Sequence, residues 1–193
     1  AQIRDFPSAV KALKPTAIIG VAATPNTFTE EVLRTMAELN ERPIVFALSN
    51  PTSRSECTAQ QAYEWSDGRA LFASGSPFPA ASFKGRHFVP RQGNNSYIFP
   101  GVGLGLIVSG ATKATDAMFM AAARTLATTV SENDLAQGSL YPPLSAVRHV
   151  SALIAAAVAD VAYANGLARK ERPADLVAYV ESHMYDPHYP EYA

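Results

Sequence analysis

Residues 92–95 of this chain read Gln-Gly-Asn-Asn, which places three carboxamide side chains in close succession with no charge among them. A carboxamide NH₂ group donates hydrogen bonds to a carboxylate or a carbonyl, and it does so without titrating near neutral pH. Such a run suits the floor of a polar binding site. Asn and Gly also dominate turns for conformational reasons. The run by itself therefore leaves two interpretations open, a binding site and a plain turn.

Other residues that could do chemistry are dispersed along the chain. The single cysteine, Cys57, has only Glu56 and Thr58 beside it, and neither would activate a thiol as a nucleophile. The four histidines lack the spacing of metal ligands, and we find no paired carboxylates for a divalent ion. We therefore expect no metal site in this chain. One cysteine also excludes a disulfide framework and fits a reducing compartment.

Three apolar runs, at residues 17–22, 44–48 and 70–75, predict strands that are buried on both faces, as in parallel sheets. The patterns Thr27-x-x-Glu30 (with Thr29 as a rival first cap) and Thr58-x-x-Gln61 predict helices between them. Strand alternating with helix is typical of a parallel sheet with crossover helices, in which ligands bind beyond the carboxyl ends of the strands. The small and polar residues that follow the three runs are thus the first candidates for a site.

The later part of the chain has a different pattern. We expect a turn at Lys84-Gly85, a short strand at 87–89 that is antiparallel at the sheet edge, and then helices near 101–110, 116–130, 144–164 and 174–185. The Gly-x-Gly segment at 101–105 lacks the spacing of a dinucleotide fingerprint and follows Pro100 instead of a strand, so we interpret its glycines as contacts for close helix packing.

The predicted fold is therefore α/β, the second half of a doubly wound, mostly parallel Rossmann-like sheet followed by a helical C-terminal extension. We assign residues 1–100 to a partial NAD(P)-binding domain whose first half-sheet lies before Ala1. We assign residues 101–193 to the helical remainder of the same domain and a C-terminal arm.

Composition adds constraints. Of the 193 residues, 48% are hydrophobic and 17% are charged, which is below the usual quarter, so we expect another domain or subunit to cover some apolar surface. A net charge of −1 offers no footprint for nucleic acid or an anionic membrane. The uncharged runs at 101–112 and 150–159 are shorter than the roughly 18–20 residues that span a bilayer, and the N-terminus has no signal-peptide pattern. We expect a cytoplasmic protein.

Four separated blocks resemble malic enzyme, in its C-terminal domain that binds the nicotinamide cofactor. They are FALSNPT at 46–52, ASGSPF at 73–78, QGNN at 92–95 followed by IFPG at 98–101, and LYPPL at 140–144. The resemblance runs from about Pro15 to the end of the chain. It implies NAD- or NADP-dependent oxidation of L-malate and decarboxylation to pyruvate, with Mg²⁺ or Mn²⁺, in a homo-oligomer (dimer or tetramer).

The resemblance also implies roles for residues. Asn50 and Asn94 would bind the carboxylate region of malate, and Asn95 would lie beside the nicotinamide. The cofactor would be lined by two strand ends, with the residues Val21, Ala22, Ala23, Leu48 and Ser49.

The catalytic lysine and tyrosine of the family, its metal ligands and its glycine fingerprint are expected upstream of Ala1, so the isolated chain should be inactive. Two departures stand out. The loop at 22–26 is less glycine-rich than in many family members, and Arg91 stands where a small residue is expected.

Two alternatives stay open at this point. A malolactic enzyme shares these blocks and converts malate to lactate. A non-catalytic domain that assembles with partners through exposed apolar faces is the alternative from another class. The preference for NAD or NADP is not encoded in this part of the chain, because the residue that reads the ribose lies upstream.

Overall fold

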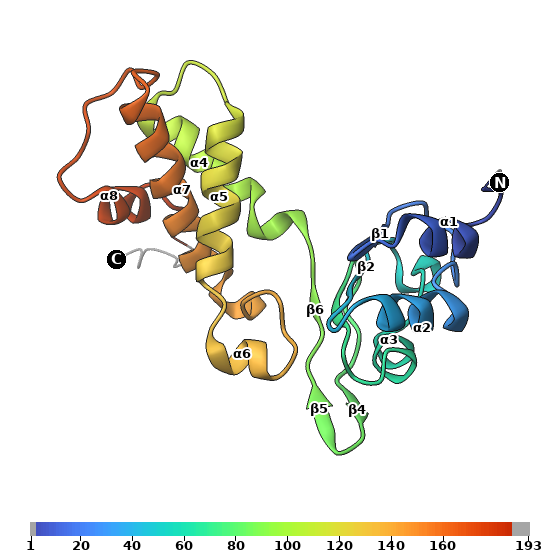
Figure 1. Cartoon of the computed structure of the whole chain (residues 1–193). Coiled ribbons are helices and arrows are strands. Elements are labelled where there is room, and N and C mark those ends of the chain that lie inside the picture. The colour runs from blue at the N-terminus through green and yellow to red at the C-terminus, as the bar shows by residue number, and fades with distance from the viewer. Residues whose placement is uncertain (1–2, 187–193) are drawn as a thin grey trace. The chain divides into compact units, whose positions relative to one another are not determined.

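The structure, a computed structural model, describes residues 3–186, which pack as two compact units (Figure 1). Of these residues, the first unit contains 3–94 together with 130–143, and the second contains 95–129 and 144–186. The chain thus leaves the first unit after Asn94 and returns to it for one short segment. The predicted C-terminal arm lies almost wholly outside the described residues.

The first unit is built on a four-stranded parallel sheet. Its strands, in spatial order, are β1 (Ala17–Gly20), β2 (Ile44–Ala47), β3 (Leu71–Ser74) and β6 (Arg91–Gln92). All four run in the same direction, so their carboxyl ends lie at one edge. The predicted α/β fold with a parallel sheet is confirmed.

Helices α1 (Phe6–Leu13), α2 (Glu30–Leu39) and α3 (Ala59–Trp65) pack with this sheet around one hydrophobic core, in which Leu33, Met36 and Phe72 are fully buried. The hydroxyl of Thr29 accepts from the amide of Val32, so the rival cap begins α2. The predicted capping box of Thr58 and Gln61 begins α3. Helix α1 was not predicted, although Asp5 caps it and a proline stands in its first turn.

A two-stranded antiparallel sheet follows β3. Its strands, β4 (Ala81–Phe83) and β5 (Arg86–Phe88), are joined by the predicted turn, with positive φ at both Lys84 (48°) and Gly85 (75°). The sequence also predicted an antiparallel strand at 87–89 on the edge of the main sheet, and this placement was wrong. The tight turn pairs β5 with β4, and the main sheet gains the parallel strand β6, which the sequence did not indicate.

The second unit is helical. It contains the 3₁₀ turns η2 (Asn95–Tyr97) and η3 (Leu144–Ala146) and the helices α4 (Phe99–Ser109), α5 (Asp116–Thr128), α7 (Val147–Ala164) and α8 (Leu176–Ser182). Helix α7 is central and packs against α4 and α5 (Figure 1). A Cβ atom added at Gly105 would lie 2.6 Å from the carbonyl oxygen of Ala155. Glycine therefore permits close approach of α4 and α7, as the sequence predicted for this segment.

Residues Leu144–Ala164 form a 21-residue helical stretch with a mean hydropathy of 1.5, long and apolar enough to cross a membrane by those measures alone. The uncharged run at 150–159 by itself is too short to predict such a segment. In the fold, Val150, Ala152 and Ile154 of this stretch are buried inside the second unit. Packing within the protein accounts for its apolar character.

Candidate functional site

The carboxyl edge of the four-stranded sheet collects most of the residues that the sequence singled out. Gly20 pairs with Ala47, Ala47 with Ser74, and Ser74 with Gln92, so the segments that follow these residues are neighbours. Predicted site residues at this edge are Val21, Ala22, Ala23, Leu48, Ser49, Asn50 and Asn94. Asn95 is the exception, because it opens the second unit.

Asn50 follows β2 and is exposed. Ser76, which follows β3, donates a hydrogen bond from its Oγ to the Asn50 Oδ1 at 2.7 Å. In this arrangement the carbonyl oxygen of the Asn50 carboxamide faces the protein. Within residues 3–186 the NH₂ group of Asn50 has no hydrogen-bond partner, so this donor is available to a ligand. Nothing in the sequence pattern indicates this contact, because Ser76 and Asn50 are 26 positions apart.

The turns after β1 and β2 are joined through a buried carboxylate. Glu56 is 1% exposed, and Ser49 donates to it twice, from Oγ to Oε1 and from the backbone amide to Oε2. The Ser49 Oγ in turn accepts a hydrogen bond of 2.9 Å from the amide of Ala23. A single side chain thus ties two segments of the site together. Sequence reasoning had weighed Glu56 only as a neighbour of Cys57, and nothing in the local pattern signalled its burial.

Strand β6 brings residues 92–94 to the same edge. The Gln92 Nε2 donates to the carbonyl oxygen of Gly75 at 2.7 Å, and the amide of Gly93 donates to the carbonyl oxygen of Ser74 at 2.8 Å. A Cβ atom at Gly93 would lie 3.2 Å from the Tyr141 hydroxyl oxygen, closer than most real Cβ contacts. Gln92 and Gly93 therefore hold the segment against its neighbours, whereas Asn94 is exposed.

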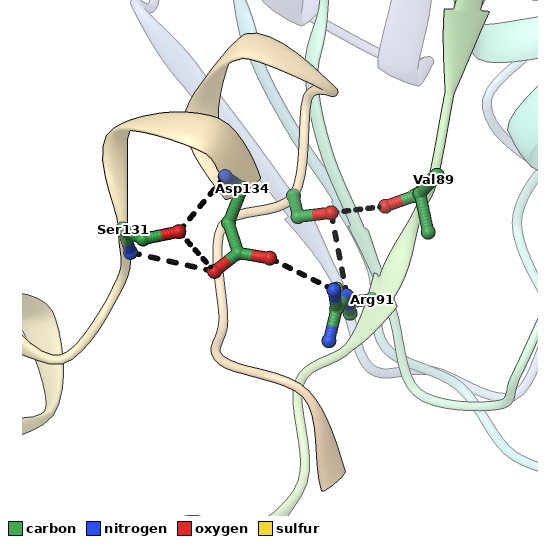
Figure 2. A network of polar contacts seen from close by, with 5 residues as sticks. Val89, Arg91, Ser131 and Asp134 are labelled. Atoms are coloured by element: carbon green, nitrogen blue, oxygen red, sulfur yellow. Dashed lines mark hydrogen bonds and ion pairs between the residues drawn. The ribbon is translucent and has the colours of Figure 1, made fainter. Parts of the chain in front are cut away.

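Arg91 anchors β6 to the segment that returns to the first unit (Figure 2). Its Nη2 forms an ion pair of 2.9 Å with Asp134 on α6 (Glu132–Ala136), and its Nε donates to the Ser139 hydroxyl. Ser139 donates to the carbonyl oxygen of Val89, and Ser131 donates to the second oxygen of Asp134, both at 2.6 Å. The Arg91 and Asp134 side chains are only 20% and 13% exposed. This network explains an arginine where the sequence analysis expected a small residue.

Asn95 begins η2 in the second unit. It lines a groove of about 490 Å³ whose other walls are the mostly apolar residues Ile98, Phe99, Val102, Gly103, Leu106 and Phe119. The backbone oxygen of Asn95 accepts from the amide of Ile98 at 3.0 Å, so the groove starts at a defined turn.

Cys57 is 2% exposed, and burial, with a smaller contribution from the charge of Glu56, raises its pKa from 9.0 to about 12. A thiol of that pKa is protonated near neutral pH and is a poor nucleophile. The buried position agrees with the sequence-based view that Cys57 does no chemistry.

A divalent metal does not fit the described residues. Residues 3–186 contain no group of three or more His, Cys, Asp or Glu side chains that could hold one. At the sheet edge, Val21, Ala22 and Ala23 are exposed, and the part of the chain that the structure describes gives the Asn50 NH₂ group no protein partner.

Comparison with known proteins places the chain in a family. Residues 1–163 match the family described as malic enzyme, NAD binding domain. The chain belongs to the malic enzyme family. It is 56% identical to the NADP-dependent malic enzyme of Phaseolus vulgaris over 191 residues, which are 98% of this chain and 32% of the bean protein. It is 52% identical to the chloroplastic NADP-dependent malic enzyme of Zea mays, covering 98% of this chain and 30% of the maize protein.

Solved structures of malic enzymes agree. The crystal structure of malic enzyme from Pyrococcus horikoshii matches with a TM-score of 0.67 and 28% identity, over 92% of this chain and 35% of that chain. The Entamoeba histolytica malic enzyme matches with a TM-score of 0.67 and 27% identity, over 86% of this chain and 30% of that chain. The chain thus spans about a third of the length of these malic enzymes and corresponds to their NAD(P)-binding domain.

Proposed function

We propose that this chain is part of an NADP-dependent malic enzyme, which oxidises L-malate and decarboxylates the product to pyruvate and CO₂. NADP is favoured over NAD because the bean and maize relatives are both named NADP-dependent. When bound, the dinucleotide would accept a hydride from malate. The chain's own residues would bind and orient malate and the nicotinamide half of the cofactor at the carboxyl edge of the sheet.

Asn50 and Asn94 are proposed to bind the carboxylate region of malate. The hydrogen bond from Ser76 holds the Asn50 carbonyl oxygen, so the free NH₂ group can donate to a substrate carboxylate. A neutral donor at this position orients the anion without adding a charge that titrates near neutral pH. Asn94 is exposed at the same edge, next to the tethered residues Gln92 and Gly93.

The turns after β1 and β2 are proposed to line the cofactor, through Val21, Ala22, Ala23, Leu48 and Ser49, with Asn95 beside the nicotinamide. Small and aliphatic side chains let a flat ring approach the backbone. The general base, the general acid and the ligands for Mg²⁺ or Mn²⁺ are proposed to lie in other parts of the parent protein. By itself this chain should be inactive.

The observation that carries the proposal is the Asn50 carboxamide, oriented by Ser76 at the edge of a malic enzyme cofactor sheet. The test is Asn50→Asp in the parent enzyme, which replaces the donor with an anion beside the substrate carboxylate. We expect kcat/KM for malate to fall by about 100-fold or more, since a lost charge-assisted hydrogen bond and a new repulsion both oppose binding. An unchanged kcat/KM for malate would contradict the assignment of Asn50.

A malolactic enzyme is the second candidate. Assay of the parent protein decides between them: pyruvate with net formation of NADPH supports the malic reaction, and lactate without net cofactor reduction supports the malolactic one. Malate-dependent NADP reduction by the purified chain alone would refute our placement of the catalytic groups outside it.

A non-catalytic assembly domain is the candidate from another class, and the exposed apolar side chains of Phe99, Ile107 and Phe119 in the second unit favour some partner. Light scattering and binding of an apolar dye test this alternative, because a monodisperse monomer that binds no dye would contradict it.

A homo-oligomeric parent is proposed on the family resemblance. The maize relative is named chloroplastic and the bean relative carries no compartment in its name, so a cytoplasmic location stays a prediction.

A further inference from the structure

We infer that Glu56 is a positioning residue for the cofactor edge, whose buried carboxylate holds the turns after β1 and β2 in the arrangement that the dinucleotide requires. The inference rests on the proposed function, because it concerns the same edge of the sheet. It adds a residue that touches neither substrate nor cofactor and acts through Ser49.

The chemistry of Glu56 matches its two contacts. An ionised carboxylate offers acceptors only, and the two oxygens of Glu56 receive two donors from Ser49, the hydroxyl and the backbone amide. A side chain that is 1% exposed cannot exchange these donors for water. The position of Ser49 is therefore set by Glu56.

The hydroxyl of Ser49 in turn fixes the turn that follows β1. It gives its only hydrogen to Glu56, so it presents lone pairs to the amide of Ala23, which donates at 2.9 Å. Ala23 has φ of +53°, in the left-handed region that a residue with a Cβ atom disfavours. A turn with such a residue needs outside support, and the bond from Ala23 to Ser49 supplies it.

Gly20 makes room for this arrangement. A Cβ atom built at Gly20 would overlap the carboxyl carbon and the Cγ of Glu56, so any larger residue at the end of β1 would push the carboxylate away from Ser49. One connected set of contacts thus lies at the edge where we place the cofactor. It contains Gly20, Glu56, Ser49 and Ala23.

Replacing Glu56 by glutamine removes the carboxylate but keeps the volume of the side chain. The amide has one acceptor oxygen, and whichever way it is turned, one of the two Ser49 donors faces an NH₂ group. Glu56→Gln should therefore shift the Ser49 turn and release Ala23, while leaving the space filled.

The test uses the full-length parent enzyme and NADPH binding measured by the cofactor's own fluorescence. We expect Glu56→Gln to raise the Kd for NADPH by about tenfold or more, because a buried donor is left without an acceptor. Ser49→Ala and Gly20→Ala should weaken NADPH binding in the same way. Because Ser49 and Glu56 act through one contact, the Ser49→Ala/Glu56→Gln double variant should lose less affinity than the product of the two single losses.

A control of similar stability distinguishes a specific effect on the cofactor edge from a general loss of stability. Val45→Ala removes two buried methyl groups in the middle of β2 and should lower Tm without changing the Kd for NADPH. If the unaltered parent binds NADPH and both Glu56→Gln and Ser49→Ala bind it equally well, the inference is overturned while the proposed function survives. If the unaltered parent binds no NADPH or NADP, the proposed function itself fails.

Discussion

In the first unit, the segments that we assign to ligand binding are held by polar side chains, whereas in the second unit α4 and α7 meet through residues with almost no side chain. Glu56, Gln92 and Arg91 each make specific hydrogen bonds that fix one segment at the sheet edge. Gly101 and Gly105 have no Cβ atom. The side chain of Ile154 and the backbone oxygen of Ala155 therefore lie where a Cβ atom at these two positions would clash.

The difference shows two ways of fixing a backbone. Directional hydrogen bonds hold chain segments that have no regular ladder of their own, as in the turns beyond strand ends. Close packing of helices needs no such bonds, because the backbone is already satisfied within each helix. The first unit should therefore be sensitive to the chemistry of side chains, and the second to their volume.

The largest loss of stability should come from adding side-chain volume between helices of the second unit. Gly105→Val would place atoms where the carbonyl oxygen of Ala155 and the Cβ of Val158 already lie, at 2.6 and 2.8 Å from the first added carbon. We expect the opening free energy of the second unit to fall by about 3 kcal/mol, the upper end of the usual cost of overpacking, because the nearest atom is a backbone oxygen that cannot move aside. Hydrogen exchange of the amides in α4 and α7 measures it.

Gly103 in the same helix supplies the control for Gly105. An added Cβ there meets nothing within 4 Å, so Gly103→Ala should stabilise the second unit by about 0.5–1 kcal/mol through the lower entropy of the unfolded chain. Equal effects at the two positions would show that helix propensity, and not close approach, decides the role of these glycines.

The next largest loss of stability should come from changing a buried hydrogen-bonding group in the first unit. Glu56→Gln conserves volume but leaves one Ser49 donor buried and unpaired, so we expect a loss of about 1–3 kcal/mol in the free energy of unfolding of the first unit. Chemical denaturation followed by the fluorescence of Trp65, which lies in this unit, measures it. A gain in stability would contradict a polar anchor at this position.

A smaller effect is expected at Arg91. Arg91→Lys keeps the charge but loses the paired donors that reach Asp134 and Ser139, and we expect a cost of about 1 kcal/mol in unfolding free energy. The exposed pair of Lys84 and Asp67, 69% and 60% exposed, is the control, and breaking it with Lys84→Met should lower the unfolding free energy less than Arg91→Lys does, because solvent screens the pair. Equal costs would mean that burial of the Arg91 pair confers no advantage.

The smallest effect near neutral pH concerns Cys57. Its folded pKa of about 12 exceeds its ordinary value of 9.0, so the stabilisation from the buried neutral thiol is full below pH 9 and is lost as pH rises toward 12. At pH 8 we expect a thiol reagent to react about a thousandfold more slowly with the folded chain than with the unfolded chain, from the thiolate fraction alone. Rapid reaction of the native chain would show that the first unit opens readily.

Much of this fold could be predicted from the sequence because its signals are local. Apolar runs of strand length, the capping pattern of Thr58 and Gln61, and the turn at Lys84-Gly85 each specify a backbone shape from adjacent residues, and the structure bears them out. The segments that were missed have weak local signals. β6 is only two residues long, and it is a strand because the amide of Gly93 and the side chain of Gln92 reach β3 and the turn that follows it.

The candidate site divides in the same way. The sequence motifs, through the family that they resemble, pointed to Asn50, Asn94 and the small residues after β1 and β2, whereas composition alone left a plain turn open for residues 92–95. Only the tertiary structure decided that Ser76 orients Asn50, that Arg91 reaches Asp134 across 43 positions in the sequence, and that Glu56 is buried beneath Ser49. Burial and pairing are properties of packed segments, and no single segment encodes which partner it will meet. Gln92-Gly93-Asn94 is thus a segment whose residue types were set by the sequence and whose position was set by the sheet beside it.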